Sequence, residues 1–168
     1  TITDQEAAAA AELNKVNAGL TSGNVRMSTE DTFAAIHANV GINYGIYDEG
    51  NYDLTNGNGD LSGTSYEALA AVNSGLAEAD QGSEVEVGKY YGTAAEQNLR
   101  VIFNPAGTHQ MQHFSTESTA DNINFFSNAF ELENRIPADS QLWLIKELLN
   151  GIGLIALLVL IVPLVILL

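Results

Sequence analysis

The carboxyl-terminal segment of the chain is the feature that most restricts its fold. Residues 148–168 form a run of 21 residues without a charged side chain, and from residue 152 onward almost all are Leu, Ile or Val. A helix of this length rises about 31 Å, close to the roughly 30 Å of a bilayer core. The alternative is a buried core helix, but this run has no polar face to turn toward water. The segment therefore predicts a transmembrane helix, in which Pro163 is tolerated.

The residues before this run favour a position at the membrane surface. Trp143, Lys146 and Glu147 precede it. Trp prefers the headgroup region, and Lys can extend its ammonium group toward water. We therefore divide the chain into a folded domain at residues 1–135, an amphipathic interfacial segment at 136–147 and a transmembrane helix at 148–168, with the lipid bilayer as a partner.

The charge of the chain excludes one class of partner. It has 21 acidic residues against 6 basic ones, a formal net charge of −15, and no cysteine. Nucleic-acid binding needs Lys and Arg to neutralise phosphates, so we expect no nucleic-acid partner. An acidic domain is more compatible with the extracytoplasmic side than with the anionic cytoplasmic leaflet, and we expect it there. The lack of cysteine excludes thiol catalysis and thiolate metal sites.

Helix and strand signals alternate along the first 135 residues. A capping box at residues 3–6 and an alanine-rich stretch predict a helix that ends near Gly19 or Gly23. The other expected elements are a helix at about 28–39, a strand at 40–47, a helix at 64–79, a minor strand or extended arm at 85–87, a strand at 99–103 and a helix capped by Ser115. This alternation predicts an α/β fold with a parallel sheet and helices on its faces.

Two residues lie just beyond the ends of the two best-defined strands. Asp48 comes after the strand at 40–47, and His109 lies in a short loop after the strand at 99–103. Ligands of parallel sheets bind beyond the carboxyl ends of the strands. A histidine can take a proton from a hydroxyl group and return it, while a carboxylate on its other ring nitrogen fixes its tautomer. Asp48 and His109 are therefore candidate catalytic residues; the alternative is a loop carboxylate and a histidine bonded to nearby backbone.

A nucleophile for such a pair is missing from the sequence. In α/β-hydrolases the chain order is nucleophile, acid, histidine, with the serine in a Gly-x-Ser-x-Gly turn after a strand. That motif is absent here. The nearest strings, at 19–23 and 59–63, have a different spacing, and no strand is expected before either. We therefore reject both as nucleophile turns.

Three other groups of residues have alternative interpretations. Glu49 could serve as the acid in place of Asp48, although a carboxylate on the solvent-facing rim is the simpler interpretation. His113 lies four residues after His109, a spacing that lets a helical pair share a metal ion, but no third ligand is evident.

The calcium-loop candidates are Asn56, Asn58, Asp60 and Glu67. Because Leu61 stands where a calcium loop has its turn-forming glycine, we expect a flexible polar loop, without bound metal or cofactor.

Several separated motifs resemble those of one protein family. They are the segments 47–49, 85–92, 100–105, 108–109, 113–115 and 136–147. In this order they resemble the carboxyl-terminal half of bacterial membrane-bound α/β-hydrolase-fold proteins, in which the hydrolase domain runs directly into transmembrane helices. The resemblance implies that Asp48 and His109 occupy the positions of the triad acid and base. It also implies that this chain is a fragment, since family members carry amino-terminal strands and a serine elbow that it lacks.

Two functions follow as expectations. The first is hydrolysis of an ester, amide or lactone, with Asp48 and His109 as acid and base and a nucleophile from an amino-terminal hydrolase segment or another membrane subunit. On this hypothesis the chain is inactive alone. The alternative is a non-catalytic, membrane-anchored structural or interaction subunit built on a hydrolase-like half-domain. Fold resemblance does not choose between them, because function resides in the site.

Overall fold

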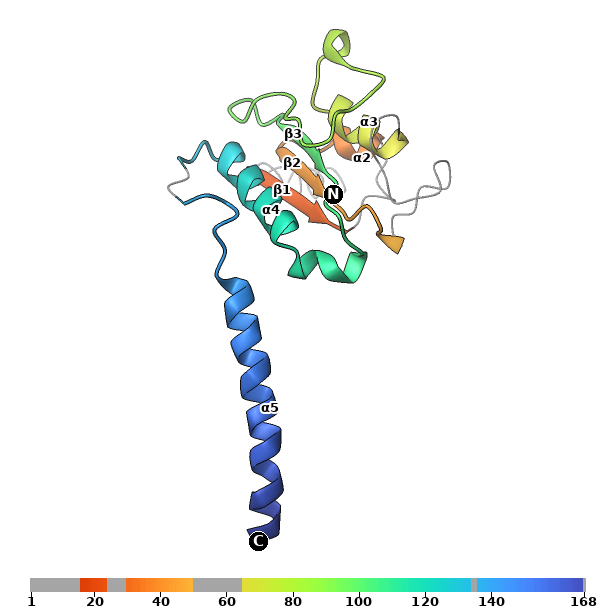
Figure 1. Cartoon of the computed structure of the whole chain (residues 1–168). Coiled ribbons are helices and arrows are strands. Elements are labelled where there is room, and N and C mark those ends of the chain that lie inside the picture. The colour runs from red at the N-terminus through yellow and green to blue at the C-terminus, as the bar shows by residue number, and fades with distance from the viewer. Residues whose placement is uncertain (1–15, 24–29, 50–64, 134–135, 168) are drawn as a thin grey trace, which may run out of the picture. The chain divides into compact units, whose positions relative to one another are not determined.

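The computed structural model describes residues 16–23, 30–49, 65–133 and 136–167. The chain divides into two compact units, Thr1–Ala138 and Asp139–Leu168, and each is considered by itself. The first unit combines short strands with helices, whereas the second contains one long helix (Figure 1).

The first unit is built on a three-stranded parallel sheet. Its strands are β1 (Ala18–Ser22), β2 (Asn39–Asn43) and β3 (Arg100–Phe103), in the spatial order β1-β2-β3. In the register of the sheet, Gly41 lies opposite Leu20 on one side and Val101 on the other. Parallel pairing requires crossover connections, which here contain helices. The prediction of an α/β fold with a parallel sheet and flanking helices is confirmed.

Strand β1 corrects the sequence prediction for the amino-terminal region. The predicted helix was extended to Gly19 or Gly23, but Ala18–Ser22 is a strand that pairs with β2. The capping box at residues 3–6 lies outside the described residues. The conformation of β1 depends on its pairing with β2, a segment distant in the sequence. The spacing of apolar residues within residues 1–23 carries no information about that pairing.

Helices and short arms complete the first unit. Its helical elements are α2 (Glu30–Ala34), α3 (Tyr66–Asn73), η2 (Glu78–Asp80), η3 (His109–Phe114) and α4 (Thr116–Ala129). Ser115 caps α4 as predicted, because its hydroxyl oxygen accepts a hydrogen bond from the Ser118 N–H at 3.1 Å. Both α2 and α3 end earlier than predicted. Of the two forms expected at 85–87, the extended arm is the one observed: the Gly88 N–H donates to the Ile102 carbonyl at 2.7 Å, along the outer edge of β3.

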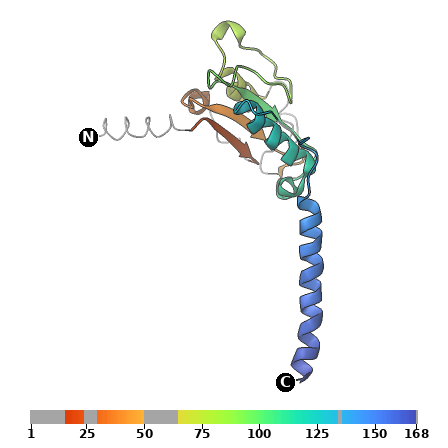
Figure 2. The same cartoon turned by 90° about the vertical axis from the view of Figure 1, so that its left-hand side faces the viewer.

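The helices cover both faces of the sheet, as Figures 1 and 2 show. Side chains of β2 alternate between the faces, since successive residues of a strand point to opposite sides. Ile42 and Tyr44 pack in the core formed with α2 and α3. Gly41 faces α4 so closely that a Cβ there would lie 2.9 Å from the Phe125 ring. Burial on both faces explains why β2 and β3 are fully buried.

The buried side chain of Arg100 on β3 forms hydrogen bonds with the segment that follows α2. Arg100 exposes only 2% of its surface, and its guanidinium group donates to the carbonyls of Ala38 at 2.7 Å and Ile36 at 3.2 Å. In the described part of the chain it pairs with no carboxylate. Burial lowers the pKa of Arg100 to about 10, so the side chain remains protonated at neutral pH. Arg100 therefore acts as a cationic donor that satisfies the carbonyls after α2.

The partly buried carboxyl group of Asp121 on α4 gives a pH-dependent stability. Burial and the nearby Glu117 carboxylate raise the pKa of Asp121 to about 6. A raised carboxyl pKa means that the folded state binds the proton more tightly, so stability falls as the pH rises from about 4 to about 6. We expect Asp121→Asn to stabilise the protein above this range by about 1 kcal/mol, after allowance for solvent screening, and to have little effect below pH ~4. Urea unfolding of the full chain in detergent, followed by circular dichroism across this pH range, measures the difference.

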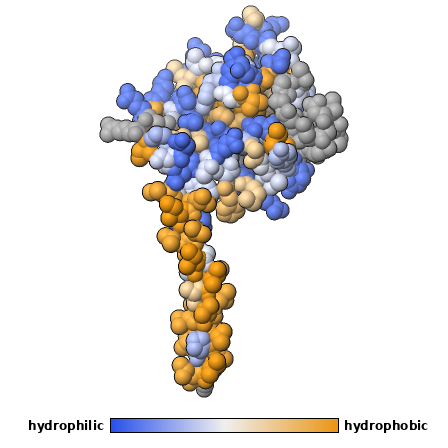
Figure 3. All heavy atoms as spheres, viewed as in Figure 1, coloured by the Kyte–Doolittle hydropathy of each residue, from blue (hydrophilic) through white to orange (hydrophobic). Residues whose placement is uncertain are grey.

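The second unit carries the membrane-spanning candidate. Helix α5 (Trp143–Leu167) has 25 residues, and it is the one helix among the described residues that is long and apolar enough to cross a membrane. Its surface is mainly apolar along the face seen in Figure 3. It begins inside the segment predicted as interfacial, so Trp143, Lys146 and Glu147 form its first turns. Pro163 lies within the helix, as expected.

Candidate active site

The loops that follow β2 and β3 run side by side. Beyond the strand ends, the N–H groups of Tyr44 and Ile46 donate to the carbonyls of Phe103 at 3.2 Å and Pro105 at 3.0 Å. The Tyr47 N–H then donates to the Gly107 carbonyl at 3.0 Å. These bonds continue the parallel ladder through both loops. The residues that come next are therefore brought to the same edge of the sheet: Asp48 on one loop, and Thr108 and His109 at the start of η3, which corrects the prediction of a loop position for His109.

A close approach of backbone makes this pairing of loops possible. Gly45 is buried beside Gly107, and a Cβ on Gly45 would lie 2.2 Å from the Gly107 carbonyl oxygen. No side chain fits in that space. Glycine at position 45 is therefore required by the contact between the two loops.

The structure brings Asp48 and His109 into direct contact. His109 Nδ1 lies 3.1 Å from Asp48 Oδ1 and 3.0 Å from Oδ2. The Asp48 side chain is fully buried, whereas 45% of the His109 side chain is exposed. An ionised carboxylate can only accept, so Nδ1 carries the proton that forms this bond and Nε2 of a neutral ring carries a lone pair. Nε2 has no hydrogen-bond partner among the described residues. This is the arrangement of a histidine able to accept a proton at Nε2.

The end of β1 supports the imidazole ring. Gly23 follows β1 with a φ of +74°, and its N–H donates to the Asn43 carbonyl at 2.9 Å. A Cβ on Gly23 would lie 2.7 Å from His109 Cε1, so the ring rests directly on the glycine backbone. The carboxyl ends of all three strands therefore meet at His109, as expected for ligand sites of parallel sheets.

The sequence analysis gave no site role to two residues near His109. Gly23 was predicted as a helix end, and no role was predicted for Gln112, a buried residue of η3. The run Leu20-Thr21 before Ser22 and Gly23 was the available signal, since it suits a strand that ends in a turn. Residues 19–22 of the string at 19–23 belong to β1 itself, so the string is not a turn that follows a strand, and its spacing differs from Gly-x-Ser-x-Gly. The string at 59–63 lies outside the described residues.

The other predicted site residues lie apart from the imidazole ring or outside the described residues. Glu49 is exposed, and its carboxylate accepts a hydrogen bond at 3.4 Å from the His109 backbone N–H. His113 is exposed on η3, and the described part of the chain contains no group of three or more His, Cys, Asp or Glu residues suited to a metal ion. Asn56, Asn58 and Asp60 lie outside the described residues, and Glu67 is in the first turn of α3. The calcium hypothesis therefore stays untested.

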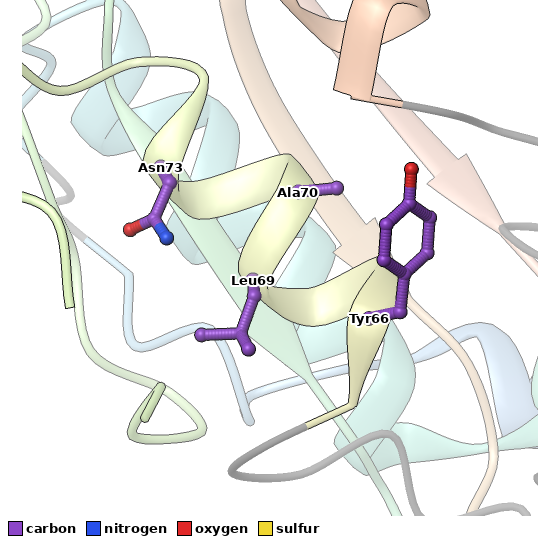
Figure 4. A pocket seen from close by; sticks show the side chains of 4 residues that line it. All are labelled: Tyr66, Leu69, Ala70 and Asn73. Atoms are coloured by element: carbon purple, nitrogen blue, oxygen red, sulfur yellow. The ribbon is translucent and has the colours of Figure 1, made fainter. Parts of the chain in front are cut away.

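Hollows also lie elsewhere on the described part of the first unit. A small one of about 80 Å³ follows one side of α3, where Figure 4 shows Tyr66, Leu69, Ala70 and Asn73. A larger, open one of about 570 Å³ lies between the 90–94 segment and the end of α4, and Tyr90, Ser127 and Asn128 line part of it. Neither is lined by Asp48 or His109, so neither adds to the site at the carboxyl edge of the sheet.

Comparison of the chain with protein-family models, with curated proteins and with solved structures gives no match. The geometry around His109 is therefore the ground on which a function can be inferred.

Proposed function

We propose that the chain is the carboxyl-terminal part of a membrane-anchored α/β-hydrolase-like protein that hydrolyses an ester, amide or lactone. The observation that carries this proposal is the pair formed by buried Asp48 and half-exposed His109 at the carboxyl edge of a parallel sheet. The resemblance of the motifs to membrane-bound α/β-hydrolase-fold proteins supports the same assignment. The net charge of the whole chain, −15, supports placing its first unit on the extracytoplasmic side.

The two residues have separate tasks in the proposed reaction. His109 Nε2 takes the proton of the attacking hydroxyl group and then delivers it to the leaving group. Asp48 keeps the other ring proton on Nδ1 and stabilises the imidazolium that forms after the first transfer. The nucleophile belongs to a segment outside these 168 residues, on the same polypeptide or on another subunit.

The free edge of β1 is the place where such a segment would pair. In the described part of the chain β1 pairs with β2 alone, and its residues Ala18–Ser22 are partly exposed and uncharged. The opposite edge of the sheet is covered, because Tyr91 forms an antiparallel bridge with Arg100. An uncharged open edge readily accepts another strand. A parallel strand added along β1 would end next to Gly23, on which the His109 ring rests.

The proposal is tested by labelling the protein in its native membrane with a serine-reactive fluorophosphonate. We expect labelling of the parent protein and a fall to background in His109→Ala, because the serine loses its general base. His113→Ala is the matched control, since it removes an exposed histidine from the same short helix. Equal labelling of parent and His109→Ala would contradict the proposal.

A non-catalytic interaction subunit is the second candidate. It is favoured by an exposed apolar stripe along α4, formed by Ile123, Phe126 and the C-cap residue Phe130. The rings of Phe126 and Phe130 stack with their centroids 6.1 Å apart. Contiguous exposed apolar side chains mark interaction surfaces. Absence of fluorophosphonate labelling in parent and variant alike would favour this candidate.

A further inference from the structure

Gln112 is a buried polar side chain beside the proposed general base. It lies in η3, three residues after His109, and exposes only 3% of its surface. Residues three apart in a 3₁₀ helix lie on the same side, so both side chains face the ends of the strands. They also reach the same point: a Cβ on Gly23 would lie 2.7 Å from His109 Cε1 and 3.0 Å from Gln112 Oε1.

The amide of Gln112 spans the ends of two neighbouring strands. Its Oε1 accepts a hydrogen bond from the Ser22 hydroxyl at 3.4 Å, at the end of β1. Its Nε2 lies 3.3 Å from where a Cβ on Gly45 would be, just beyond β2. This Nε2 is buried and has no hydrogen-bond partner among the described residues. A buried N–H without an acceptor destabilises a fold, so packing alone would favour an apolar residue at this position.

We propose that Gln112 is a positioning residue for His109. Its amide holds Ser22 and Gly23 against η3 and keeps the end of β1 at a fixed distance from Gly45. The imidazole ring is thereby held against Gly23 with Nδ1 toward Asp48. The catalytic importance of this ring position rests on the proposed function, but the effect of Gln112 on the His109 ring does not.

The experiment is nitrogen-15 NMR of the histidine rings in the full chain, reconstituted in lipid nanodiscs. The chain has 3 histidines, and His37→Gln and His113→Gln assign the His109 signals. In the parent we expect His109 to favour the Nδ1–H tautomer. In Gln112→Ala we expect the ratio of the two tautomers to shift roughly three- to tenfold toward Nε2–H, the size of one ordinary hydrogen bond, with increased ring mobility. Gln110→Ala is the matched control, because Gln110 is an exposed glutamine of the same helix.

An unchanged tautomer ratio and ring mobility in a folded Gln112→Ala protein would overturn the proposal. So would an equal shift in Gln110→Ala. If Gln112→Ala does not fold, Gln112→Met is judged by the same two criteria, since it keeps the length of the side chain and removes the amide. The readout needs no nucleophile, so it separates this proposal from the hydrolase proposal, which fluorophosphonate labelling tests.

Discussion

Replacement of Asp48 by asparagine is expected to slow fluorophosphonate labelling of the membrane-bound protein by roughly 10³- to 10⁴-fold, because it would hold the triad histidine in the wrong tautomer. The amide of asparagine can donate a hydrogen bond to Nδ1, which places the ring proton on Nε2, the atom that must accept the serine proton. Water cannot take over the role of the carboxylate, because Asp48 is fully buried. The time course of labelling in isolated membranes measures the loss.

Glu49→Gln is the matched control for this change. It also neutralises a carboxylate, one residue away, but Glu49 bonds to the backbone N–H of His109 and not to the ring. We expect its labelling rate to stay close to that of the parent. A large loss in Glu49→Gln with little change in Asp48→Asn would show that Glu49 is the acid and would overturn the assignment of Asp48.

The sequence was sufficient to predict that Asp48 and His109 lie at one edge of a parallel sheet. Each follows a strand rich in β-forming residues, and strand ends of a parallel sheet share an edge. Their contact at about 3 Å needed one further feature, the ladder of backbone bonds that continues past both strands. Backbone bonds between loops leave little trace in residue type, apart from the glycine at position 45.

The support for the imidazole ring could not be predicted, because it depends on a strand that local patterns assigned to a helix. Apolar residues at helical spacing continued to Leu20, and strand formation at β1 depends on pairing with β2. Helix signals were reliable where the conformation depends only on residues close in the sequence, as with the Ser115 cap of α4. The apolar run of α5 is also local, which is why its presence was predicted, although its first turns were not.

Replacement of Gly45 by alanine is expected to separate the two loops that carry Asp48 and His109. The new Cβ would lie 2.2 Å from the Gly107 carbonyl oxygen, a backbone atom that cannot rotate away. Overpacking of a buried site of this kind costs about 1–3 kcal/mol of unfolding free energy, and relief requires the backbone to move. We expect that loss in urea unfolding of the full chain in detergent, together with loss of the fixed Nδ1–H tautomer of His109 in NMR.

Gly107→Ala is the control, and it distinguishes close contact from a general intolerance of side chains in these loops. A Cβ on Gly107 would meet no heavy atom within 4 Å, and Gly107 does not have a positive φ. We therefore expect Gly107→Ala to leave the unfolding free energy and the tautomer of His109 close to those of the parent. Equal effects of the two substitutions would mean that loop flexibility, and not the approach of Gly45 to Gly107, holds the acid and the histidine together.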